Sequence, residues 1–202
     1  MYKNILWDFD GVILNSMQIR DWGFKQIFMT FSSREVDELI KFHQLNGGLS
    51  RYVKIRYFFE KILKKTITDD KVNEYAIEFS MLMKQVLTDQ KNLIMNSVNF
   101  IRKNYSKFNF HIVSGSDQKE LKYLCKKLDI SDLFISINGS PTNKEILIEK
   151  IIIKHRYKRE ETYLIGDSIN DLEAAKFNKI QFYGYNNPSL NDKCKYIVSF
   201  SN

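Results

Sequence analysis

Two acidic residues near the start of the chain have the spacing of a metal-binding or phosphate-accepting pair. Asp8 and Asp10 come directly after the apolar run Ile5–Trp7, and Gly11 follows them. Alternate residues of extended backbone point to the same side, so we expect the two carboxylates to lie close together. Such carboxylates repel each other, and a hard divalent cation such as Mg²⁺ relieves the repulsion. The pair therefore predicts a divalent metal site from which Gly11 turns the backbone away, although paired acids are also typical of receiver domains and of simple loop caps.

A second acidic cluster repeats this arrangement near the other end of the chain. Asp167 and Asp171 follow the apolar run Tyr163–Ile165, within the segment Gly-Asp-Ser-Ile-Asn-Asp. Helix capping by Asp167 or Ser168 explains one of these acids but not Asp171 as well. We therefore expect both aspartates to lie beside the same metal site as the first pair.

Three further residues have the chemistry to bind an anion. Ser114 and Gly115 lie where an apolar run joins a helix, a junction that offers hydroxyl and backbone N–H groups to a phosphoryl group. Lys144 falls in the first turn of another helix, which a capping-box pattern of Thr142 and Glu145 is expected to open. The helix macrodipole disfavours a cation in that turn, so the lysine indicates a functional role.

The elements that must position these residues alternate between strand and helix. The apolar runs of strand length are Ile5–Trp7, Phe108–Val113, Leu133–Ile137, Tyr163–Ile165, Ile180–Tyr183 and Tyr196–Val198. Their alternation with helical patterns predicts an α/β fold with a parallel sheet. Because ligands bind beyond the carboxyl ends of the strands in such sheets, the acidic clusters, Ser114 and Lys144 should converge there.

The stretch 15–95 lacks the alternation of strands and helices, because its apolar residues follow the helical period and no predicted strand interrupts them. We expect it to form an all-helical cap domain, with residues 1–14 and 96–202 forming the sheet domain. The crossings near Asn15–Ser16 and Asn92–Ser97 would be the hinges. Another helix is expected after the run that contains Ser114, where Asp117 and Glu120 form a capping-box pattern.

Composition and charge argue against a nucleic-acid-binding protein and against a secreted or membrane protein. The net charge is +7 and the pI is near 9.2, but the lysines are spread along polar helix faces, so we expect no nucleic-acid partner. Cys125 and Cys194 have apolar neighbours and are expected to be reduced. No signal-peptide pattern is found, and no apolar run approaches the roughly 20 residues that cross a bilayer. We therefore expect a cytoplasmic protein without membrane association.

Taken in order, these motifs resemble those of the haloacid dehalogenase superfamily. The matching features are Asp8-x-Asp10-Gly-Val, a strand that ends in Ser114, Lys144, and Gly-Asp167-x-x-x-Asp171. A helical insert after the first motif is similar to the C1 cap of the phosphoglycolate phosphatase and beta-phosphoglucomutase branch. The resemblance implies a Rossmann-like core, bound Mg²⁺ and hydrolysis of a small phosphorylated metabolite by a monomer or homodimer. An aspartate at position 10 disfavours dehalogenase chemistry, because dehalogenase members lack that acid.

The resemblance also implies a role for each motif residue. Asp8 would attack phosphorus and form an aspartyl-phosphate, while Asp10 would protonate the leaving oxygen and then activate water. Mg²⁺ would be held by Asp8, the backbone oxygen of Asp10 and Asp167, and Asp171 would support the metal shell through water. Ser114 and Lys144 would neutralise the phosphoryl oxygens and Asp8, and the backbone at Gly11 and Gly115 would lie against the substrate.

Within the predicted cap, the segment Leu45–Arg51 resembles the substrate-specificity loop of this branch. Arg51 is expected to bind a second phosphate or a carboxylate of the substrate, and His43 to contribute nearby, although a lone histidine is more often a packed or solvated residue. Two other functions stay open at this point. One is a sugar-phosphate mutase that uses the same Asp8 and Asp10, and the other is a non-catalytic, receiver-like module that is phosphorylated on aspartate.

Overall fold

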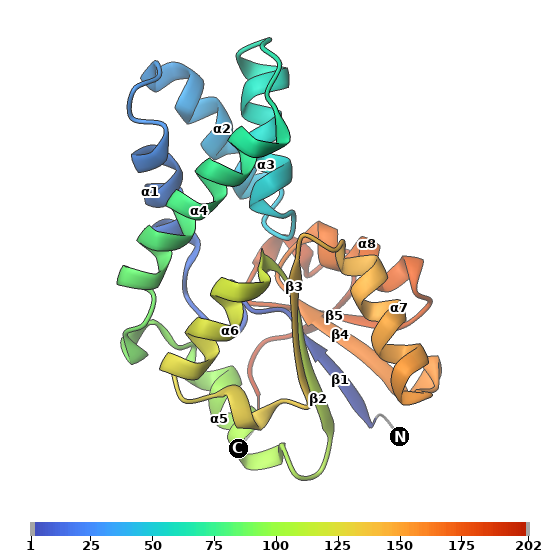
Figure 1. Cartoon of the computed structure of the whole chain (residues 1–202). Coiled ribbons are helices and arrows are strands. Elements are labelled where there is room, and N and C mark those ends of the chain that lie inside the picture. Colours follow the sequence, from blue (N-terminus) through green and yellow to red (C-terminus); the bar gives the residue numbers. More distant parts are fainter. Residues whose placement is uncertain (1–2, 201–202) are drawn as a thin grey trace.

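The computed structural model describes residues 3–200, and its centre is a six-stranded sheet in which every strand pairing is parallel. The strand order is β3-β2-β1-β4-β5-β6, so β1 lies between β2 and β4 (Figure 1). The strands are β1 (Asn4–Trp7), β2 (Asn109–Asp117), β3 (Ser136–Ser140), β4 (Thr162–Gly166), β5 (Gln181–Tyr185) and β6 (Lys195–Ile197). The α/β fold with a parallel sheet is thus confirmed.

Helices cover both faces of this sheet, because its strands alternate between two apolar clusters. Ile5 and Trp7 of β1 face one cluster, while Leu6 faces the other. Helices α5 (Met95–Asn104) and α6 (Gln118–Lys127) contribute to the first cluster. Helices α7 (Lys144–His155) and α8 (Ile169–Phe177) contribute to the second. The sheet is therefore the middle layer of three, which leaves its carboxyl edge as the place for a polar site.

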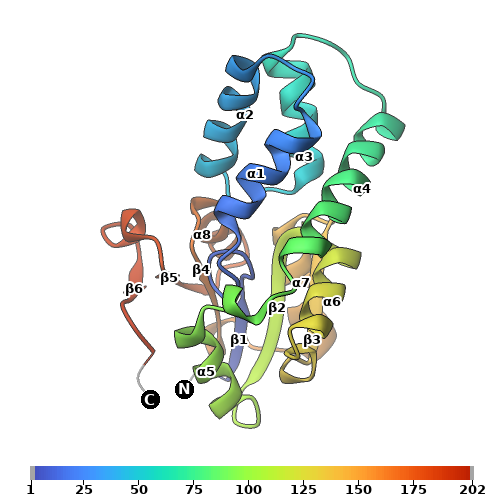
Figure 2. The ribbon, with the colours of Figure 1, turned by 90° about the vertical axis from the view of Figure 1, so that its left-hand side faces the viewer.

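Between β1 and α5 the chain is helical, as expected. This part contains α1 (Met17–Ile27), α2 (Ser33–Leu45), α3 (Arg51–Tyr57), which continues as a π-helical turn over Phe58–Ile62, and α4 (Asp69–Val86). We call these helices the cap. They gather beyond the carboxyl edge of the sheet, and Figure 2 shows them above β1 and β2. The exact domain boundaries stay a prediction.

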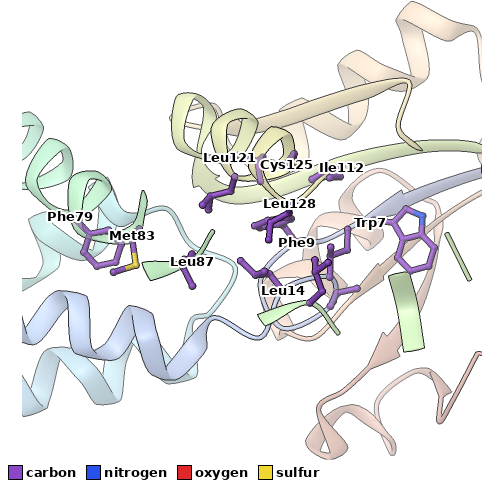
Figure 3. Packing of buried hydrophobic residues seen from close by; sticks show 14 of the residues in the cluster. Trp7, Phe9, Leu14, Phe79, Met83, Leu87, Ile112, Leu121, Cys125 and Leu128 are labelled. Carbon is purple, nitrogen blue, oxygen red and sulfur yellow. The ribbon is translucent and has the colours of Figure 1, made fainter. Parts of the chain in front are cut away.

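The two crossings between cap and sheet lie side by side. The backbone N–H of Asn15 donates to the carbonyl of Asn92 at 2.7 Å, and Leu14 forms an isolated β-bridge with Leu93. Figure 3 shows Phe79 of α4 on the cap side of Leu14, and the apolar cluster runs on from there to Trp7 of β1. The cap therefore shares a continuous apolar core with the sheet at its base.

The apolar run Leu133–Ile137 predicted β3 too early in the sequence. The run Leu133–Ile137 predicted a strand, but Ser131–Leu133 forms a 3-10 turn and β3 begins only at Ser136. Polar contacts hold the later segment in the sheet: the side chain of Gln118 donates to the carbonyl of Ile137 at 2.9 Å and accepts from the N–H of Gly139 at 2.6 Å. Pairing with β2 thus overrides the weak strand propensity of the sequence Asn-Gly-Ser.

Two other expectations concern single features of the chain. Both cysteines are free, as expected. Over residues 3–200, none of the helices combines the length and the apolar character that crossing a membrane requires.

Candidate active site

Three carboxylates meet at the carboxyl edge of the sheet. Asp8 follows β1, Asp167 follows β4, and Asp171 lies in the first turn of α8. Because β1 and β4 are neighbours in register, with Trp7 opposite Ile165, the residues that follow them come together. Asp8, Asp167 and Asp171 each offer one oxygen, and these oxygens lie within 4.8 Å of one another. We call these three residues the carboxylate cluster.

Lys144 supplies positive charge to two members of this cluster. Its ammonium donates to Asp8 at 2.7 Å and is also bonded to Asp171, and all three side chains are buried. Burial opposes the charge of Lys144, but Asp171 and Asp8 outweigh it and raise the pKa of the lysine. Its place in the first turn of α7 is as expected, but the capping box of Thr142 and Glu145 is wrong: Asn143 is the N-cap and makes no side-chain capping bond.

The electrostatics of the carboxylate cluster leave negative charge without a partner. Burial raises the pKa of Asp8 to about 7, opposed by Lys144 and reinforced by Asp171 and Asp10. Burial, Asp8 and Asp171 raise the pKa of Asp167 well above its ordinary value. Among the described residues, Asp167 forms no ion pair. Hard oxygen atoms with surplus negative charge are the donor set that Mg²⁺ prefers, so the residues fit that ion.

Asp171 has a structural role that the sequence interpretation excluded. Ser168 is the N-cap of α8, and Asp171 completes a capping box by accepting from the backbone N–H of Ser168 at 3.1 Å. The hydroxyl of Ser168 also donates to Asp171 at 2.7 Å. The argument that capping could not explain Asp171 was therefore wrong. The same carboxylate caps the helix with one oxygen and meets Lys144 with the other.

Asp10 does not join the carboxylate cluster with its side chain. Its carboxylate accepts from Ser116 at 2.5 Å, from the Nε of Arg20 at 2.6 Å, and from Ser16. Although burial raises the pKa of Asp10, the charge of Arg20 and the hydroxyl bonds together lower it below its ordinary value. The expectation that alternate residues would place both carboxylates side by side is thus wrong, because Arg20 of the cap and Ser116 of β2 hold the Asp10 carboxylate apart from the cluster. Only its backbone oxygen remains as a candidate metal ligand.

Two glycines at the site permit close approach of other groups. Gly11 has φ of 79°, and a Cβ there would overlap the carboxylate of Asp167. A Cβ on Gly115 would overlap the carbonyl of Gly48, which lies in the connection 46–50 between α2 and α3, here called the cap loop. The cap loop therefore lies directly against the end of β2. Ser114 is buried beside Gly115, and its hydroxyl accepts from the backbone N–H of Ser116 at 3.0 Å.

Arg51 reaches the core, but it meets a carboxylate of the protein there. Its guanidinium forms an ion pair with Glu120 of α6 at 2.6 Å and lies 4.7 Å from the ring centre of Phe79. Arg20 of α1 contacts the same Glu120 at 3.1 Å. Asp117 caps α6 as expected, but the Glu120 side chain turns to the arginines, so no reciprocal capping box forms. Two cap arginines thus converge on one fully buried core carboxylate.

Sequence reasoning missed Arg20, Glu120 and Lys54. Arg20 lies four residues before Phe24 and seven before Ile27, so it occupies the apolar stripe of its helix, where a charge indicates a partner. Lys54 has the same signal, because it lies four residues before the buried Phe58. His43 is buried and bonded to Lys54 rather than solvated.

A small cavity joins these cap residues to the end of β2, with a volume of about 300 Å³ that includes its open mouth. It is lined by Asp10, Arg20, Phe24, His43, Gly47, Leu49, Arg51, Lys54, Phe79, Gly115 and Ser116. The cavity therefore connects Asp10 and Gly115 with Arg51 and His43 of the cap.

The fold is shared with several solved structures. Beta-phosphoglucomutase from Clostridium difficile aligns with a TM-score of 0.79 and 14% identity over 98% of this chain and 92% of its own. CbbY from Rhodobacter sphaeroides in complex with phosphate aligns with a TM-score of 0.77 and 14% identity, over 98% and 94%. The HAD-hydrolase YfnB from Bacillus subtilis, bound to magnesium, aligns with a TM-score of 0.70 and 15% identity, over 98% and 94%.

Sequence comparison identifies the family. No curated protein matches the chain. The sequence profile of the haloacid dehalogenase-like hydrolases, however, matches residues 5–185, which include every residue of the carboxylate cluster, Asp10, Lys144 and the cap. The suspected resemblance is thereby confirmed, and the similar structures include a member of the expected beta-phosphoglucomutase branch. The chain therefore belongs to the haloacid dehalogenase-like hydrolase family.

Proposed function

We propose that the chain is a Mg²⁺-dependent phosphatase that hydrolyses a small phosphorylated metabolite through an aspartyl-phosphate on Asp8. The observation that carries this proposal is the placement of Asp8. Asp8 is 3% exposed and follows the central strand β1, and its carboxylate lies 2.7 Å from the ammonium of Lys144 and within the carboxylate cluster. A nucleophile at that point lies between a fixed cation and a metal-binding set, which is what transfer of a dianionic phosphoryl group requires.

In the first step Asp8 attacks phosphorus, so an O–P bond forms to Asp8 while the bond from phosphorus to the leaving oxygen breaks. The leaving oxygen takes a proton from Asp10. In the second step a water molecule attacks the aspartyl-phosphate, Asp10 accepts its proton, and phosphate leaves. Arg20 and Ser116 favour the ionised form of Asp10, which is the form that accepts a proton from water in the second step.

Other residues of the chain support these steps by position and charge. Lys144 holds the Asp8 carboxylate in place and offsets the charge of incoming phosphoryl oxygens. The Ser114 hydroxyl and the backbone at Gly11 and Gly115 would contact those oxygens. Asp8, Asp167 and the backbone oxygen of Asp10 would hold Mg²⁺, with Asp171 behind them. When bound, Mg²⁺ would neutralise the developing charge of the transferred group.

The cap limits the size of the substrate. Its loop lies against Gly115, and the cavity between the cap and Asp10 is small. A phosphoprotein could not place its phosphoryl group on Asp8 without displacing the cap, so small metabolites are the substrate class that the cavity supports. Whether the protein acts as a monomer or a homodimer stays a prediction.

The test is phosphate release from a panel of small phosphate monoesters, with Mg²⁺ and with EDTA. Wild type should turn over with Mg²⁺ only, and Asp8→Asn should be inactive, because a carboxamide cannot act as the nucleophile. Asp192→Asn, an exposed aspartate, is the matched control and should keep wild-type activity. Equal turnover by wild type and Asp8→Asn would overturn the assignment of Asp8.

A sugar-phosphate mutase is the second candidate, and the similarity to beta-phosphoglucomutase is the observation that favours it. A mutase would return the phosphoryl group from Asp8 to another hydroxyl. It would therefore show isomerisation that depends on a bisphosphate activator and little release of phosphate. Phosphate release without an activator would decide for the hydrolase.

A further inference from the structure

Two asparagines beside the carboxylate cluster have no part in the reaction proposed above. Asn186 and Asn187 directly follow β5, which is the neighbour of β4 in the sheet. They also lie just beyond residues 5–185, the part of the chain that the family profile matches. Nδ2 of Asn186 donates to the carbonyl of Gly11 at 2.8 Å, and Nδ2 of Asn187 donates to the carbonyl of Asp167 at 2.7 Å. Each asparagine therefore holds a different loop of the proposed metal site.

The two loops have little else to fix them on this side. Within residues 3–200, no backbone N–H donates to the carbonyl of Gly11 or to that of Asp167. Asp167 and both asparagines line a cavity with a volume of about 970 Å³ that includes its open mouth. Solvent therefore reaches this side of the loops, and burial alone does not hold their carbonyls in one direction.

Gly11 depends on such a bond more than another residue would. Its φ of 79° lies in the left-handed region, and a residue without a side chain has wide conformational freedom. Rotation at Gly11 changes the direction of its carbonyl relative to that of Asp10, the proposed metal ligand on the preceding residue. A Cβ at Gly11 would overlap the Asp167 carboxylate, so this turn also sets how closely the two loops approach. A bond that holds the Gly11 carbonyl thus restrains both ligands.

The segment that carries the asparagines is itself anchored. Asn187 is the N-cap of the 3-10 turn Pro188–Leu190, and its Oδ1 accepts from the backbone N–H of Ser189 at 3.2 Å and from the Ser189 hydroxyl at 2.9 Å. Leu190, at the end of this turn, is fully buried in the second apolar cluster. Asn186 has φ of 56°, a left-handed conformation that asparagine adopts more readily than most residues. Both amides are therefore presented to the loops by an anchored turn.

A side-chain amide suits this position because it donates hydrogen bonds without carrying charge. A lysine or arginine there would repel a divalent cation, and a carboxylate would repel the carbonyl oxygens that it faces. Groups that hydrogen-bond to the ligands of a metal orient those ligands. Their loss typically lowers metal affinity or activity by about 10-fold to 100-fold.

We propose that Asn186 and Asn187 are positioning residues for the Mg²⁺ site, an inference that rests on the proposed phosphatase. Asn186 orients the Asp10–Gly11 peptide, and Asn187 orients the loop that carries Asp167. The segment after β5 thus contributes to metal binding without supplying a ligand.

The experiment measures Mg²⁺ binding to the substrate-free protein by thermal unfolding over a series of Mg²⁺ concentrations. Asn186→Gly keeps the left-handed backbone and removes the amide, and Asn187→Ser keeps a capping oxygen but is too short to reach the Asp167 carbonyl. In each variant the Kd for Mg²⁺ should rise by about 10-fold to 100-fold. The Mg²⁺ concentration for half-maximal phosphate release should rise with it, whereas kcat at saturating Mg²⁺ should stay close to that of wild type.

Two exposed residues provide matched controls. Lys179→Gly introduces glycine at another left-handed residue, with φ of 53°, and Asn191→Ser makes the change from asparagine to serine in the same segment as Asn187. Both controls should bind Mg²⁺ as wild type does.

A folded variant that binds Mg²⁺ with the wild-type Kd would overturn the proposal for its residue, whatever its Tm in EDTA. The two variants are measured independently, so the second decides if the first does not fold. Wild type that gains no stability from Mg²⁺ and releases no phosphate from any monoester would instead overturn the phosphatase proposal, and this inference with it.

Discussion

Asp167→Asn should stabilise the metal-free protein, although it removes a residue of the proposed metal site. Asp167 is the member of the carboxylate cluster that Lys144 does not contact among the described residues. Its charge is therefore opposed by two neighbouring carboxylates and relieved by no direct partner. Asparagine keeps the size of the side chain and removes this repulsion.

The magnitude follows from the spacing of the cluster. Two ionised carboxylate oxygens 4.8 Å apart repel each other by about 3.5 kcal/mol at an effective dielectric constant of 20. Asp167 faces two such neighbours, but its raised pKa shows that protonation relieves part of the repulsion. We therefore expect a gain of about 2–4 kcal/mol in the free energy of unfolding at pH 8. For a chain of this length, that gain raises Tm by roughly 4–16 °C.

The pH dependence has a definite sign. The folded-state pKa of Asp167 lies above its unfolded value of 3.8, so the folded state keeps the proton to higher pH. The destabilisation is absent below the unfolded pKa and grows as pH rises through the folded one. Metal-free wild type should thus gain stability when the pH falls from 8 towards 5, and Asp167→Asn should gain less.

The assay is thermal unfolding in EDTA at both pH values, and in Mg²⁺ at pH 8. Mg²⁺ that binds only the folded state should raise the Tm of wild type and of the control Asp192→Asn, but barely that of Asp167→Asn. The reasoning is refuted if Asp167→Asn unfolds in EDTA at or below the wild-type temperature. Equal stabilisation of wild type and variant by Mg²⁺ would remove Asp167 from the metal site.

Two further predictions concern the contacts between cap and core. Arg20→Met should lower kcat by roughly 10-fold to 100-fold, because Asp10 loses the group that positions it. The pKa of Asp10 should rise in this variant, so the acidic limb of the pH–rate profile should move to higher pH. Arg20→Lys should partly restore the wild-type profile. An unchanged profile would leave Arg20 a purely structural role. Tyr52→Phe removes a bond of 2.8 Å to Asp117 and should lower the free energy of unfolding by about 1 kcal/mol, measured by urea denaturation, whereas an unchanged midpoint would show that the bond adds no stability.

The sequence was sufficient to predict a parallel sheet and the approach of Asp8 to Asp167 and to Lys144. These residues lie at the ends of strands or at the start of a helix, and the topology of a parallel sheet brings such positions to one edge whatever the side-chain details. The helical character of the cap was equally readable, because its apolar period is continuous over several turns.

The polar contacts of the cap could not be predicted in the same way. Arg20 and Glu120 are 100 residues apart in sequence, and their pairing depends on how the cap helices α1 and α4 are placed relative to α6. The direction of Asp10 depends on the same packing, because Arg20 supplies its partner. The predicted N-cap of α7 was wrong for a local reason. Thr and Asn are both acceptable cap residues, so backbone angles decide whether Thr142 or Asn143 occupies the cap position.

The side-by-side crossings at Asn15 and Asn92 have a consequence for how this enzyme could change over evolutionary time. A segment whose two ends meet at one point can be lengthened, shortened or exchanged without disturbing the sheet that carries it. Arg20 limits that freedom, because it belongs to the cap and forms an ion pair with Asp10, which belongs to the sheet domain. A protein that acquired a new cap would therefore need a new partner for Asp10. A change of cap would thus alter substrate selection and catalytic rate at the same time.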